Sequence, residues 1–391
     1  MSSAVLPTYN RAPLSFVKGA GSWLTTDDGR RFLDLGAGIA VNALGHAHPA
    51  LVAALGEQAG RLWHVSNLYT IPEQERLARM LADKTFADRV FFTNSGTEAA
   101  ELAIKMARKY HHDKGRPRAQ IIAFEGAFHG RSTGAIAAAG SEKMTRGFGP
   151  LMPGFTQLKW GDHEALRAAI TEDTCAVIIE PVQGEGGIRV LPDQCLKGLR
   201  DLCDSHGALL ILDEVQCGMG RTGRLFAHEW AGVTPDIMMV AKGIGGGFPL
   251  GAVLATENAA SGMVAGTHGS TYGGNPLACA VGAKVMEIIA DDAFLAEVNR
   301  KAALFRQGLE SLVAAHPAVF DAVRGEGLIL GLHCVVPSGD VVKAGYDANL
   351  LTVPAADNVI RLLPALNIPD DDIAEALRRL DTAAGAVERH A

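Results

Sequence analysis

One lysine follows an apolar run and stands directly before a glycine-rich turn. The run Ile237–Val240 predicts a buried strand, and Lys242 is followed by Gly243 and by Gly245–Gly247. Burial disfavours an ammonium group and lowers its pKa, and the neutral amine is a nucleophile that forms a Schiff base with aldehydes. Glycines beside it let a flat ring approach the backbone closely. In isolation, however, Lys242 would more simply be a strand-end lysine whose ammonium reaches solvent.

Acidic residues also follow two apolar runs. Asp213 comes directly after Leu210–Leu212, and an aspartate buried at a strand end is costly unless it has a partner. A protonated ring nitrogen would be such a partner, and the alternatives are capping of the next helix or pairing with an arginine. Glu180 and Glu185 lie on a glycine-rich loop after another strand, where a solvated turn is the simpler interpretation.

The stretch Thr93–Glu101 indicates a strand end, a turn of small polar residues and the start of a helix. Ser95 and Glu98 fit a capping box. The free N–H groups and the dipole of a helix N-terminus attract phosphate, and the hydroxyls of Ser95 and Thr97 can add hydrogen bonds. A plain N-cap is the alternative, and it is the commoner role of these residue types.

An aromatic residue and an arginine follow a further predicted strand. Phe128 is suited to stacking on a flat ring, and Arg131 can hold a carboxylate through two hydrogen bonds. Taken singly, a core phenylalanine and a surface arginine are the simpler alternatives.

A sheet must position these residues, because each stretch follows a short apolar run. Such runs alternate with helical segments from about residue 59 to 270, and they cover 89–93, 120–124, 176–180, 208–213 and 237–240. Continuous apolar strands between helices predict an α/β fold with a mainly parallel sheet covered on both faces. Ligands of such sheets bind at the carboxyl ends of the strands, which is where the candidate side chains fall.

The rest of the chain predicts a smaller α+β domain. Residues 23–34 predict a hairpin that turns at Asp28-Gly29, and Pro49 is expected to open a helix. Beyond residue 275 we expect a helical region over 281–315, strands at 325–334 and 359–363, and a last helix from Asp370 onward. The predicted organisation is therefore an N-terminal segment 1–58 that packs with a C-terminal small domain 275–391, and a large domain 59–274.

Composition excludes several classes of protein. A formal charge of −7 without basic clusters argues against a nucleic-acid binder, and no apolar run approaches the ~20 residues of a membrane span. The first residues lack the features of a signal peptide, and the six cysteines show no paired spacing, so we expect reduced thiols in a cytoplasmic protein. Neither C-x-x-C nor H-E-x-x-H occurs, so no metal site is predicted.

A phosphate cradle, a stacking ring, a carboxylate for a ring nitrogen and a nucleophilic lysine are together what pyridoxal 5′-phosphate (PLP) requires. The chain resembles the class III aminotransferases of the fold-type I group of PLP enzymes, and among these the acetylornithine aminotransferases. The resemblance extends from Gly38–Asn42 to Ile360–Pro364 and lies in motifs of specific order, spacing and identity. It implies that the large domain binds PLP.

The resemblance implies a cofactor role for one group of residues. Lys242 would carry the Schiff base to PLP, Asp213 would pair with the ring nitrogen, and Gln216 would lie near the ring hydroxyl. Phe128 would stack on the ring face. The phosphate would be held by Ser95, Gly96 and Thr97.

A second group would act on substrates and on assembly. The resemblance implies that Arg131 and Arg361 bind substrate carboxylates, that Asn42 lies in the substrate site, and that Glu185 gates Arg361. Thr271 would reach the phosphate of the neighbouring subunit. The protein would then be a homodimer with shared active sites.

The implied reaction moves the δ-amino group of N2-acetyl-L-ornithine to 2-oxoglutarate, in arginine biosynthesis. It gives N-acetyl-L-glutamate 5-semialdehyde and L-glutamate by a ping-pong route through the two cofactor forms. Succinylornithine, ornithine and 4-aminobutyrate are competing donors. Ornithine aminotransferases resemble this loop but have a tyrosine where this chain has Gly38, which favours an N-acylated donor over free ornithine.

Two other classes of enzyme fit less well. A same-fold aminomutase or decarboxylase is disfavoured, because Arg361 as a carboxylate clamp suits a transfer between two substrates. A nicotinamide-dependent oxidoreductase is disfavoured because none of the several Gly-x-Gly spacings, such as those at 36–38 and 325–327, follows a strand and opens a helix with a complete Gly-x-Gly-x-x-Gly motif.

Overall fold

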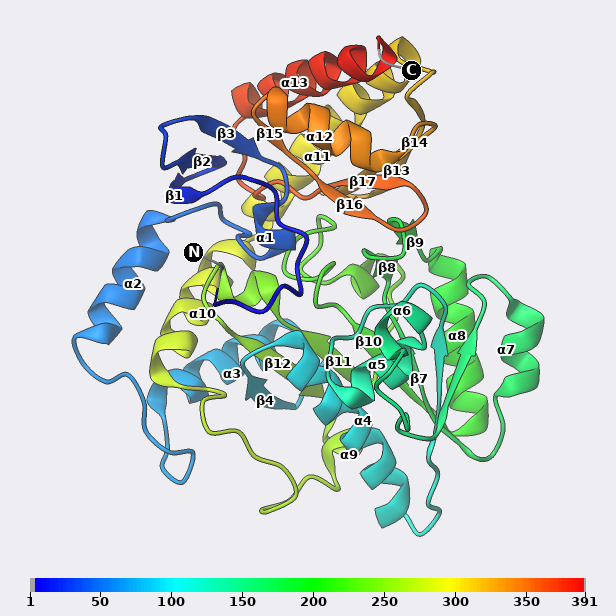
Figure 1. The fold of residues 1–391 in the computed structure, drawn as a ribbon. Coiled ribbons are helices and arrows are strands. Elements are labelled where there is room, and N and C mark those ends of the chain that lie inside the picture. The colour runs from blue at the N-terminus through cyan, green and yellow to red at the C-terminus, as the bar shows by residue number, and fades with distance from the viewer. Residues whose placement is uncertain (1–3, 390–391) are drawn as a thin grey trace.

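A computed structural model describes residues 4–389, so the outermost ends of the predicted first and last domains, 1–3 and 390–391, lie outside the described residues. A large sheet with helices on both faces forms one body, and the N-terminal strands lie with the C-terminal elements in a second body above it (Figure 1). Among residues 4–389, none of the helices combines the length and the apolar character needed to cross a bilayer.

The large sheet has seven strands in the order β4-β12-β11-β10-β7-β5-β6. Their bounds are Arg89–Thr93 (β4), Gly251–Ala255 (β12), Ile237–Val240 (β11), Leu209–Asp213 (β10), Thr174–Ile179 (β7), Gln120–Phe124 (β5) and Phe155–Leu158 (β6). The predicted parallel sheet is confirmed for β11, β10, β7, β5 and β6. The sequence pattern missed β6 and β12, and β12 pairs antiparallel with both β11 and β4.

The strands bury both faces, as their continuous apolar composition requires. On one side, Ile121 and Ala123 of β5 pack in a cluster with Leu102 of helix α4; on the other, Ile122 packs in a cluster with Leu199 of helix α8. The helices of this body are α2 (Pro49–Ala59), α3 (Pro72–Lys84), α4 (Gly96–Asp113), α5 (Thr133–Ala139), α6 (Glu142–Thr145), α7 (His163–Ala169), α8 (Asp193–His206), α9 (Glu257–Ala260) and α10 (Pro276–Ile289), with short 3-10 turns η1 (Ala227–Trp230) and η2 (Lys242–Gly245).

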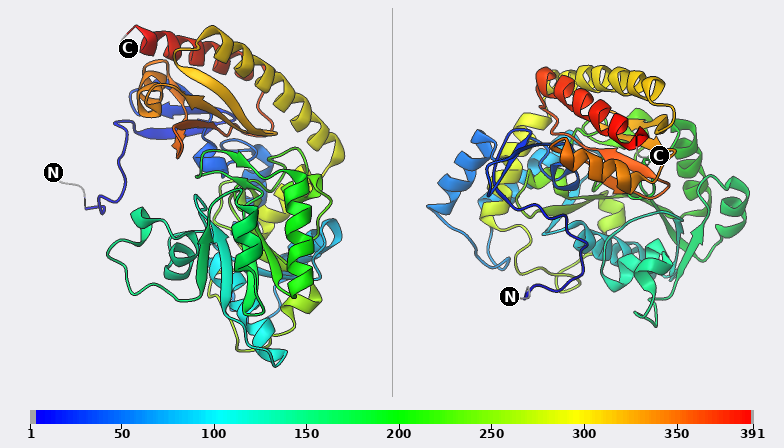
Figure 2. Two further views of the ribbon diagram at one scale, coloured as in Figure 1. Left: turned by 90° about the vertical axis from the view of Figure 1, so that its right-hand side faces the viewer. Right: turned by 45° about the horizontal axis from the view of Figure 1, so that its top comes forward.

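The second body joins the two ends of the chain. The predicted hairpin is confirmed as β2 (Trp23–Thr26) and β3 (Arg31–Asp34), flanked by β1 (Phe16–Ala20), and β3 pairs in parallel with β15 (Leu350–Leu351). The C-terminal sheet has the order β13-β14-β17-β16. Its strands and the covering helices are β13 (Phe320–Glu326), β14 (Ile329–Cys334), β16 (Val353–Ala355), β17 (Val359–Leu362), α11 (Asp292–Ala315), α12 (Ser338–Asp347) and α13 (Asp370–Glu388). Figure 2 shows the N-terminal strands beside these elements. The exact limits of the three predicted domains stay a prediction.

Two predicted elements of the C-terminal half were wrong in detail. The helical region 281–315 is divided, because Asp291 caps a new helix by accepting a hydrogen bond from the Phe294 N–H at 2.9 Å. The predicted strand 325–334 contains a hairpin turn at Gly327, whose φ is +56° and where a Cβ would lie 2.5 Å from the Thr222 backbone. A left-handed glycine in close backbone contact ends β13 and returns the chain as β14.

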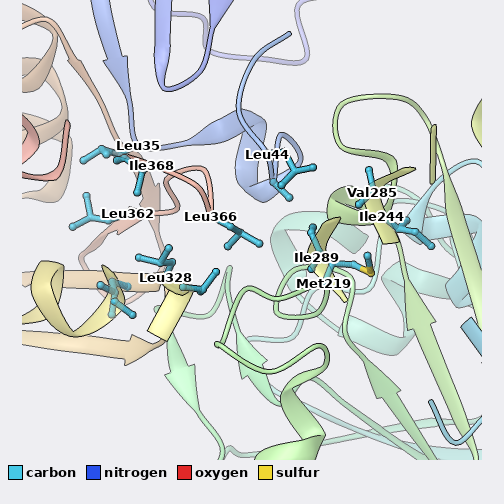
Figure 3. Packing of buried hydrophobic residues seen from close by; sticks show 14 of the residues in the cluster. Leu35, Leu44, Met219, Ile244, Val285, Ile289, Leu328, Leu362, Leu366 and Ile368 are labelled. Atoms are coloured by element: carbon cyan, nitrogen blue, oxygen red, sulfur yellow. The ribbon is translucent and has the colours of Figure 1, made fainter. Parts of the chain in front are cut away.

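A large cluster of buried apolar side chains connects the two bodies (Figure 3). Leu362 and Leu366 come from the C-terminal body, whereas Ile244 and Val285 come from the large body, and all four are buried. Ile244 follows Lys242 closely in the turn η2, so the core that joins the bodies also fixes the turn that carries the lysine.

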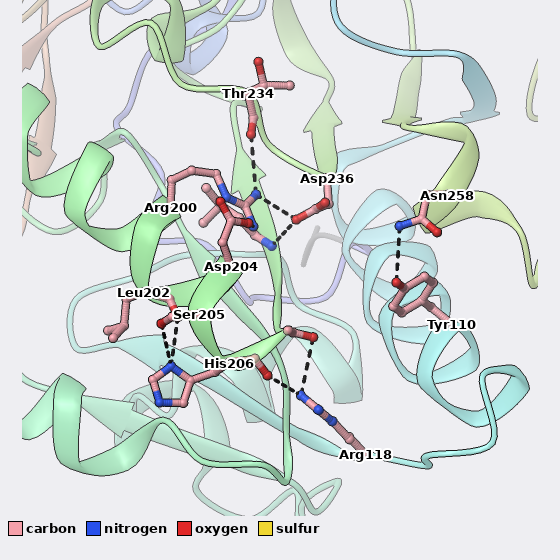
Figure 4. A network of polar contacts seen from close by, with 12 residues as sticks. Tyr110, Arg118, Arg200, Leu202, Asp204, Ser205, His206, Thr234, Asp236 and Asn258 are labelled. Atoms are coloured by element: carbon pink, nitrogen blue, oxygen red, sulfur yellow. Dashed lines mark hydrogen bonds and ion pairs between the residues drawn. The ribbon is translucent and has the colours of Figure 1, made fainter.

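Polar contacts hold the starts of the central strands (Figure 4). Arg200 of α8 contacts Asp236 at 2.8 Å and Asp204 at 2.7 Å, and Asp236 accepts a hydrogen bond from the Leu210 N–H at 2.8 Å. Asp236 directly precedes β11, so the network fixes the relative position of β10 and β11, whose other ends carry Asp213 and Lys242.

Candidate active site

A cavity of about 400 Å³ lies where the carboxyl ends of β10 and β11 meet the N-terminus of α4. A volume of this size holds an organic ring together with a substrate. The predicted site residues in its lining are Ser95, Gly96, Thr97, Phe128, Arg131, Asp213, Gln216 and Lys242. These residues come from four separate stretches of sequence, and the sheet gathers them as predicted.

Lys242 combines an unusual backbone with a partly buried ammonium. Its φ is +49°, a left-handed conformation that costs a non-glycine residue about 1–2 kcal/mol and that accumulates at functional sites. Burial lowers the pKa of the Lys242 ammonium, although the nearby Glu185 and Asp213 carboxylates oppose that shift. No hydrogen bond or ion pair of its side chain occurs within residues 4–389, so Nζ is available to a ligand.

Asp213 is buried and held by a histidine. Its Oδ2 lies 2.7 Å from His129 Nδ1, and its Oδ1 accepts a hydrogen bond from the Val215 N–H at 3.0 Å. Both side chains are almost fully buried, at 3% and 2% exposed. The alternative of an arginine partner for Asp213 is wrong, because the partner is a histidine. His129 Nδ1 fixes one carboxylate oxygen and leaves the aspartate facing the cavity.

Glu180 is a second buried acid in the lining. Its Oε2 accepts a hydrogen bond from the Phe128 N–H at 3.1 Å, and the side chain is 5% exposed. Burial, together with the Asp213 carboxylate, raises the pKa of Glu180 well above its usual range. A neutral Glu180 carboxyl can donate a hydrogen bond into the cavity without adding a second negative charge beside Asp213.

The N-terminus of α4 opens on the cavity. Ser95 is the N-cap, and its Oγ accepts a hydrogen bond from the Glu98 N–H at 3.4 Å. The predicted capping box is only half confirmed, because the Glu98 carboxylate accepts from the Asn94 N–H and the Ser95 hydroxyl but not from the Ser95 N–H. A Cβ on Gly96 would lie 2.9 Å from Val215, so only glycine leaves this N-terminus open. Free N–H groups of such a terminus suit a phosphate.

The Thr97 hydroxyl supports the neighbouring loop. Thr97 Oγ1 accepts hydrogen bonds from the Arg131 and Ser132 N–H groups, both at 3.1 Å. The Arg131 guanidinium lies 5.6 Å from the centre of the Phe128 ring. Arg131 forms no ion pair within residues 4–389, so an exposed guanidinium faces the cavity beside an aromatic ring.

Glu185 and Arg361 form an ion pair at the border of the two bodies. Arg361 lies on β17 and is 1% exposed, and it also donates hydrogen bonds to Gln216 Oε1 at 3.3 Å and to the Pro354 carbonyl at 3.1 Å. Gln216 lines the cavity, so it connects this pair to the ligand space. A buried guanidinium with one acidic partner can accept a different carboxylate in its place.

The N-terminal loop reaches the cavity through a left-handed turn. Residues Ala37–Ala40 (α1) have φ between 44° and 67°, and Asp34 accepts the Gly36 and Ala37 N–H groups at 2.8 and 3.0 Å. Val41 then lines the cavity. Asn42 lies beside it, against Gly247, where a Cβ would come within 2.7 Å of Asn42 Oδ1.

Asn42, Glu185 and Arg361 lie beside the cavity lining, whereas Thr271 lies in a different part of the molecule. It is exposed in a separate groove of about 1010 Å³, formed with residues of the 64–92 region. Two exposed apolar side chains lie close to it: Leu68 lines the same groove, and Tyr272 is the next residue in the sequence. The expected contact of Thr271 with a neighbouring subunit stays a prediction.

His129 was not predicted as a site residue, and Glu180 was considered as an acid on a glycine-rich loop but was given no role. His129 directly follows Phe128, and Glu180 ends the predicted strand 176–180, so both stood at the predicted sheet edge. The expected burial of these polar side chains could have identified them, because a buried polar side chain needs a hydrogen-bonding partner. His129 contacts Asp213, and Glu180 accepts a hydrogen bond from the Phe128 N–H.

The lining fits PLP. The open N-terminus of α4 can hold the phosphate, Asp213 offers a buried carboxylate to the ring nitrogen, and Lys242 offers an unpaired amine to the aldehyde. Phe128 supplies an aromatic face for the ring.

Comparison with solved structures supports the same fold. N-acetylornithine aminotransferase from Stenotrophomonas maltophilia is 40% identical, with a TM-score of 0.86, over 98% of each chain. Ornithine aminotransferase from Toxoplasma gondii is 33% identical, with a TM-score of 0.95, over 99% of this chain and 94% of that one. Fold-type I PLP enzymes thus share the architecture predicted from the sequence.

Sequence comparison covers almost the entire chain. An acetylornithine aminotransferase from Rhodobacter capsulatus is 71% identical over 389 residues, which are 99% of each protein. The family model for class-III aminotransferases matches residues 5–384, a range that includes every residue of the cavity lining. The chain therefore belongs to the class-III aminotransferases and is a PLP-dependent enzyme.

Proposed function

We propose that this enzyme transfers the δ-amino group of N2-acetyl-L-ornithine to 2-oxoglutarate, giving N-acetyl-L-glutamate 5-semialdehyde and L-glutamate in arginine biosynthesis. The observation that carries the proposal is the Glu185–Arg361 ion pair beside the cavity that contains Lys242. It provides a carboxylate site that can be masked, which a transfer between two unlike substrates requires. The name and 71% identity of the Rhodobacter capsulatus relative support the choice of donor.

When bound, PLP supplies an aldehyde that accepts an amino group and a ring that accepts electrons. Burial lowers the pKa of Lys242, which favours the neutral amine, and a neutral Nζ can take a proton from the substrate carbon and return it. Asp213 would offer its carboxylate to the ring nitrogen, and His129 Nδ1 holds that carboxylate in place. Ser95, Gly96 and Thr97 anchor the phosphate.

Glu185 acts as a gate for Arg361: while the two side chains are paired, the guanidinium is masked from substrate carboxylates. N-acetylornithine reacts at its δ end, so no carboxylate lies next to the reacting carbon, and Glu185 stays paired with Arg361. Glutamate and 2-oxoglutarate react next to a carboxylate, which displaces Glu185 and takes Arg361 as its partner. Arg131 holds the far carboxylate of both substrates.

The turn around Gly38 supports an acylated donor. Gly38 has φ of +67°, and its missing Cβ would lie 3.2 Å from Asn42 Nδ2. A tyrosine there, as in ornithine aminotransferases, would be strained and would meet Asn42. The site therefore lacks the tyrosine that would help to hold free ornithine.

Relative kcat/KM values test the donor. We expect N-acetylornithine to exceed ornithine and 4-aminobutyrate by at least about 100-fold, the discrimination that placed polar contacts achieve. Succinylornithine is the sharper comparison, because it differs only in the acyl group. Equal or higher kcat/KM for ornithine would reject the proposal.

Single turnovers test the gate. With Glu185→Gln, Arg361 stays available, so the glutamate half-reaction should accelerate and discrimination between the δ- and α-amino groups of ornithine should fall. Arg361→Ala should slow the 2-oxoglutarate half-reaction far more than the acetylornithine half-reaction. Equal losses in both half-reactions for both variants would exclude the gate.

We further propose a homodimer whose active sites are shared. Thr271 would contact the phosphate bound by the other subunit, and the exposed apolar residues Trp63, Leu68, Tyr69 and Tyr272 support burial of this face. Sedimentation at assay concentration should show a dimer, and an active monomer would refute the assignment.

A cytoplasmic location is also proposed: all six cysteines are free, as in reducing compartments, and cell fractionation should find the activity there.

A further inference from the structure

Glu185 lies at the tip of a very small hairpin. Strands β8 (Val182–Gln183) and β9 (Arg189–Val190) pair antiparallel, and Glu185 lies in the loop between them. We call residues 182–190 the gate hairpin. A two-stranded hairpin is at best marginally stable alone, so contacts from outside must determine where Glu185 stands.

Those contacts come from the C-terminal sheet. The Ala356 N–H donates a hydrogen bond to the Glu185 carbonyl at 3.0 Å. Arg324 Nη1 donates to the Gly187 carbonyl at 3.1 Å and to Asp357 Oδ2 at 2.7 Å. Arg324 lies on β13 and Asp357 in the turn between β16 and β17, so one arginine joins the tip of the gate hairpin to two parts of the sheet.

The tip is also packed against that sheet. Ile188 is 1% exposed, clusters with Ile329 and Val359, and adopts a left-handed φ of +54°. A β-branched residue keeps such a conformation only where its surroundings impose it. Gly187 has φ of +103°, and a Cβ there would lie 2.8 Å from the Cβ of Asp357. Backbone and side chains of the tip therefore sit in direct contact with the β16–β17 turn.

The same turn carries the partner of Glu185. Arg361 follows it on β17, and its Nη2 donates to the Pro354 carbonyl of β16 at 3.1 Å. The Glu185 backbone and the Arg361 backbone are thus fixed to one structural unit, although the two residues belong to different bodies of the chain. Only the Glu185 side chain, about one-third exposed, is left free to move.

We propose that Arg324 and Asp357 are positioning residues of the gate: they clamp the gate hairpin to the C-terminal sheet, so that the gate opens by rotation of the Glu185 side chain while its backbone stays in place. This inference rests on the gate described under the proposed function. Without the clamp, the Glu185–Arg361 ion pair forms a smaller fraction of the time, and Arg361 then has only the neutral acceptors Gln216 and Pro354. Loss of the clamp therefore resembles a partial loss of the Glu185 charge.

The test compares Arg324→Ala and Asp357→Asn with the wild-type enzyme in single turnovers. Asparagine tolerates the left-handed φ of +55° at position 357, so the second variant removes only the charge. For both variants we expect the glutamate-to-acetylornithine ratio of rate constants to move toward the Glu185→Gln value by about five-fold, the effect of one hydrogen bond. The double variant Arg324→Ala/Glu185→Gln should match Glu185→Gln alone, because the clamp acts through Glu185.

A second measurement reports the clamp without turnover. In the cofactor-free protein, hydrogen exchange of the peptide that contains the Ala356 amide should become about ten-fold faster in Arg324→Ala, because that amide donates to Glu185. Arg300→Ala is the matched control. It removes an exposed arginine of α11 that pairs with Glu297 and Asp370, and both readouts should stay at the wild-type values.

Three results would overturn the clamp. Wild-type exchange and a wild-type ratio in both variants would show that the hairpin needs no clamp. If Arg324→Ala shifts the glutamate-to-acetylornithine ratio as much in the Glu185→Gln variant as in the wild-type enzyme, Arg324 does not act through Glu185. A wild-type ratio in Glu185→Gln itself would remove the gate of the proposed function, a result distinct from the other two because it does not involve Arg324.

Discussion

The Asp213 carboxylate gives the sharpest prediction. Asp213→Asn keeps the size and the planar shape of the side chain but removes its charge. The carboxylate is 3% exposed, and one of its oxygens is already fixed by His129. Because the charge is held next to the proposed position of the ring nitrogen, it is worth most when the ring takes up electrons.

The expected magnitude comes from the single electrostatic interaction that Asp213→Asn removes. Removing one fixed electrostatic interaction from an active site lowers kcat by about 10²–10³-fold, or roughly 2.7–4 kcal/mol. We expect Asp213→Asn to lose at least about 10²-fold in kcat. His129→Ala leaves the charge but removes its hydrogen bond, which is worth about 1.5–3 kcal/mol for a charged partner, so its loss should be no more than about 10²-fold.

The assay is kcat at saturating PLP and saturating substrates, together with a cofactor titration to show that both variants are loaded. His129 acts through Asp213, so the double variant should be no slower than Asp213→Asn alone. His129→Asn, which can place a donor near the position of Nδ1, should recover part of the loss. A change of less than three-fold in kcat for Asp213→Asn would refute the role of the charge.

Three further predictions concern other parts of the chain. Lys242→Ala should fold and bind PLP through the phosphate site but show no steady turnover and no absorbance band of a lysine–PLP bond; near-wild-type turnover would contradict the assignment. Gly96→Ala should weaken PLP binding by about ten-fold, because its Cβ would press on Val215, and an unchanged dissociation constant in a fluorescence titration would reject this reason. Burial lowers the pKa of His316, but its contacts with the Asp381 and Glu388 carboxylates outweigh burial and raise that pKa above 6.5. The stabilisation is therefore complete below about pH 6.5 and is lost as pH rises through the raised pKa, so the melting temperature of His316→Gln should fall below wild type more at pH 6 than at pH 9.

Local sequence was enough to predict which stretches reach the site. Lys242 and Asp213 each follow a buried strand, and parallel strands bring their carboxyl ends to one edge, so the pattern alone places them together. The antiparallel β12 was missed for a local reason as well: after Lys242 the glycine-rich turn returns the chain directly beside β11.

Contacts between distant stretches could not be predicted from the residues alone. His129 and Asp213 are 84 positions apart, and Glu185 and Arg361 are 176 apart. No periodicity or spacing indicates such pairs. The gate was expected only from the family resemblance, and the hairpin contacts that hold it were not expected at all, because they depend on how the C-terminal sheet packs on the large body.

The gate and the reactive lysine are also coupled through charge, which gives a last prediction. Burial lowers the pKa of Lys242, and Glu185 is the carboxylate that opposes this most strongly, whereas Arg361 adds to the lowering. Removing the Glu185 charge should therefore lower the pKa of Lys242 further, so that Nζ becomes neutral at a lower pH. The rate at which cofactor-free protein combines with PLP depends on neutral Nζ and can be followed by absorbance across pH. For Glu185→Gln the rise of that rate should move to lower pH, while Glu310→Gln, a change of an exposed side chain on helix α11, should leave it in place. A rise that stays at the wild-type pH or moves upward would show that opening the gate does not alter the lysine.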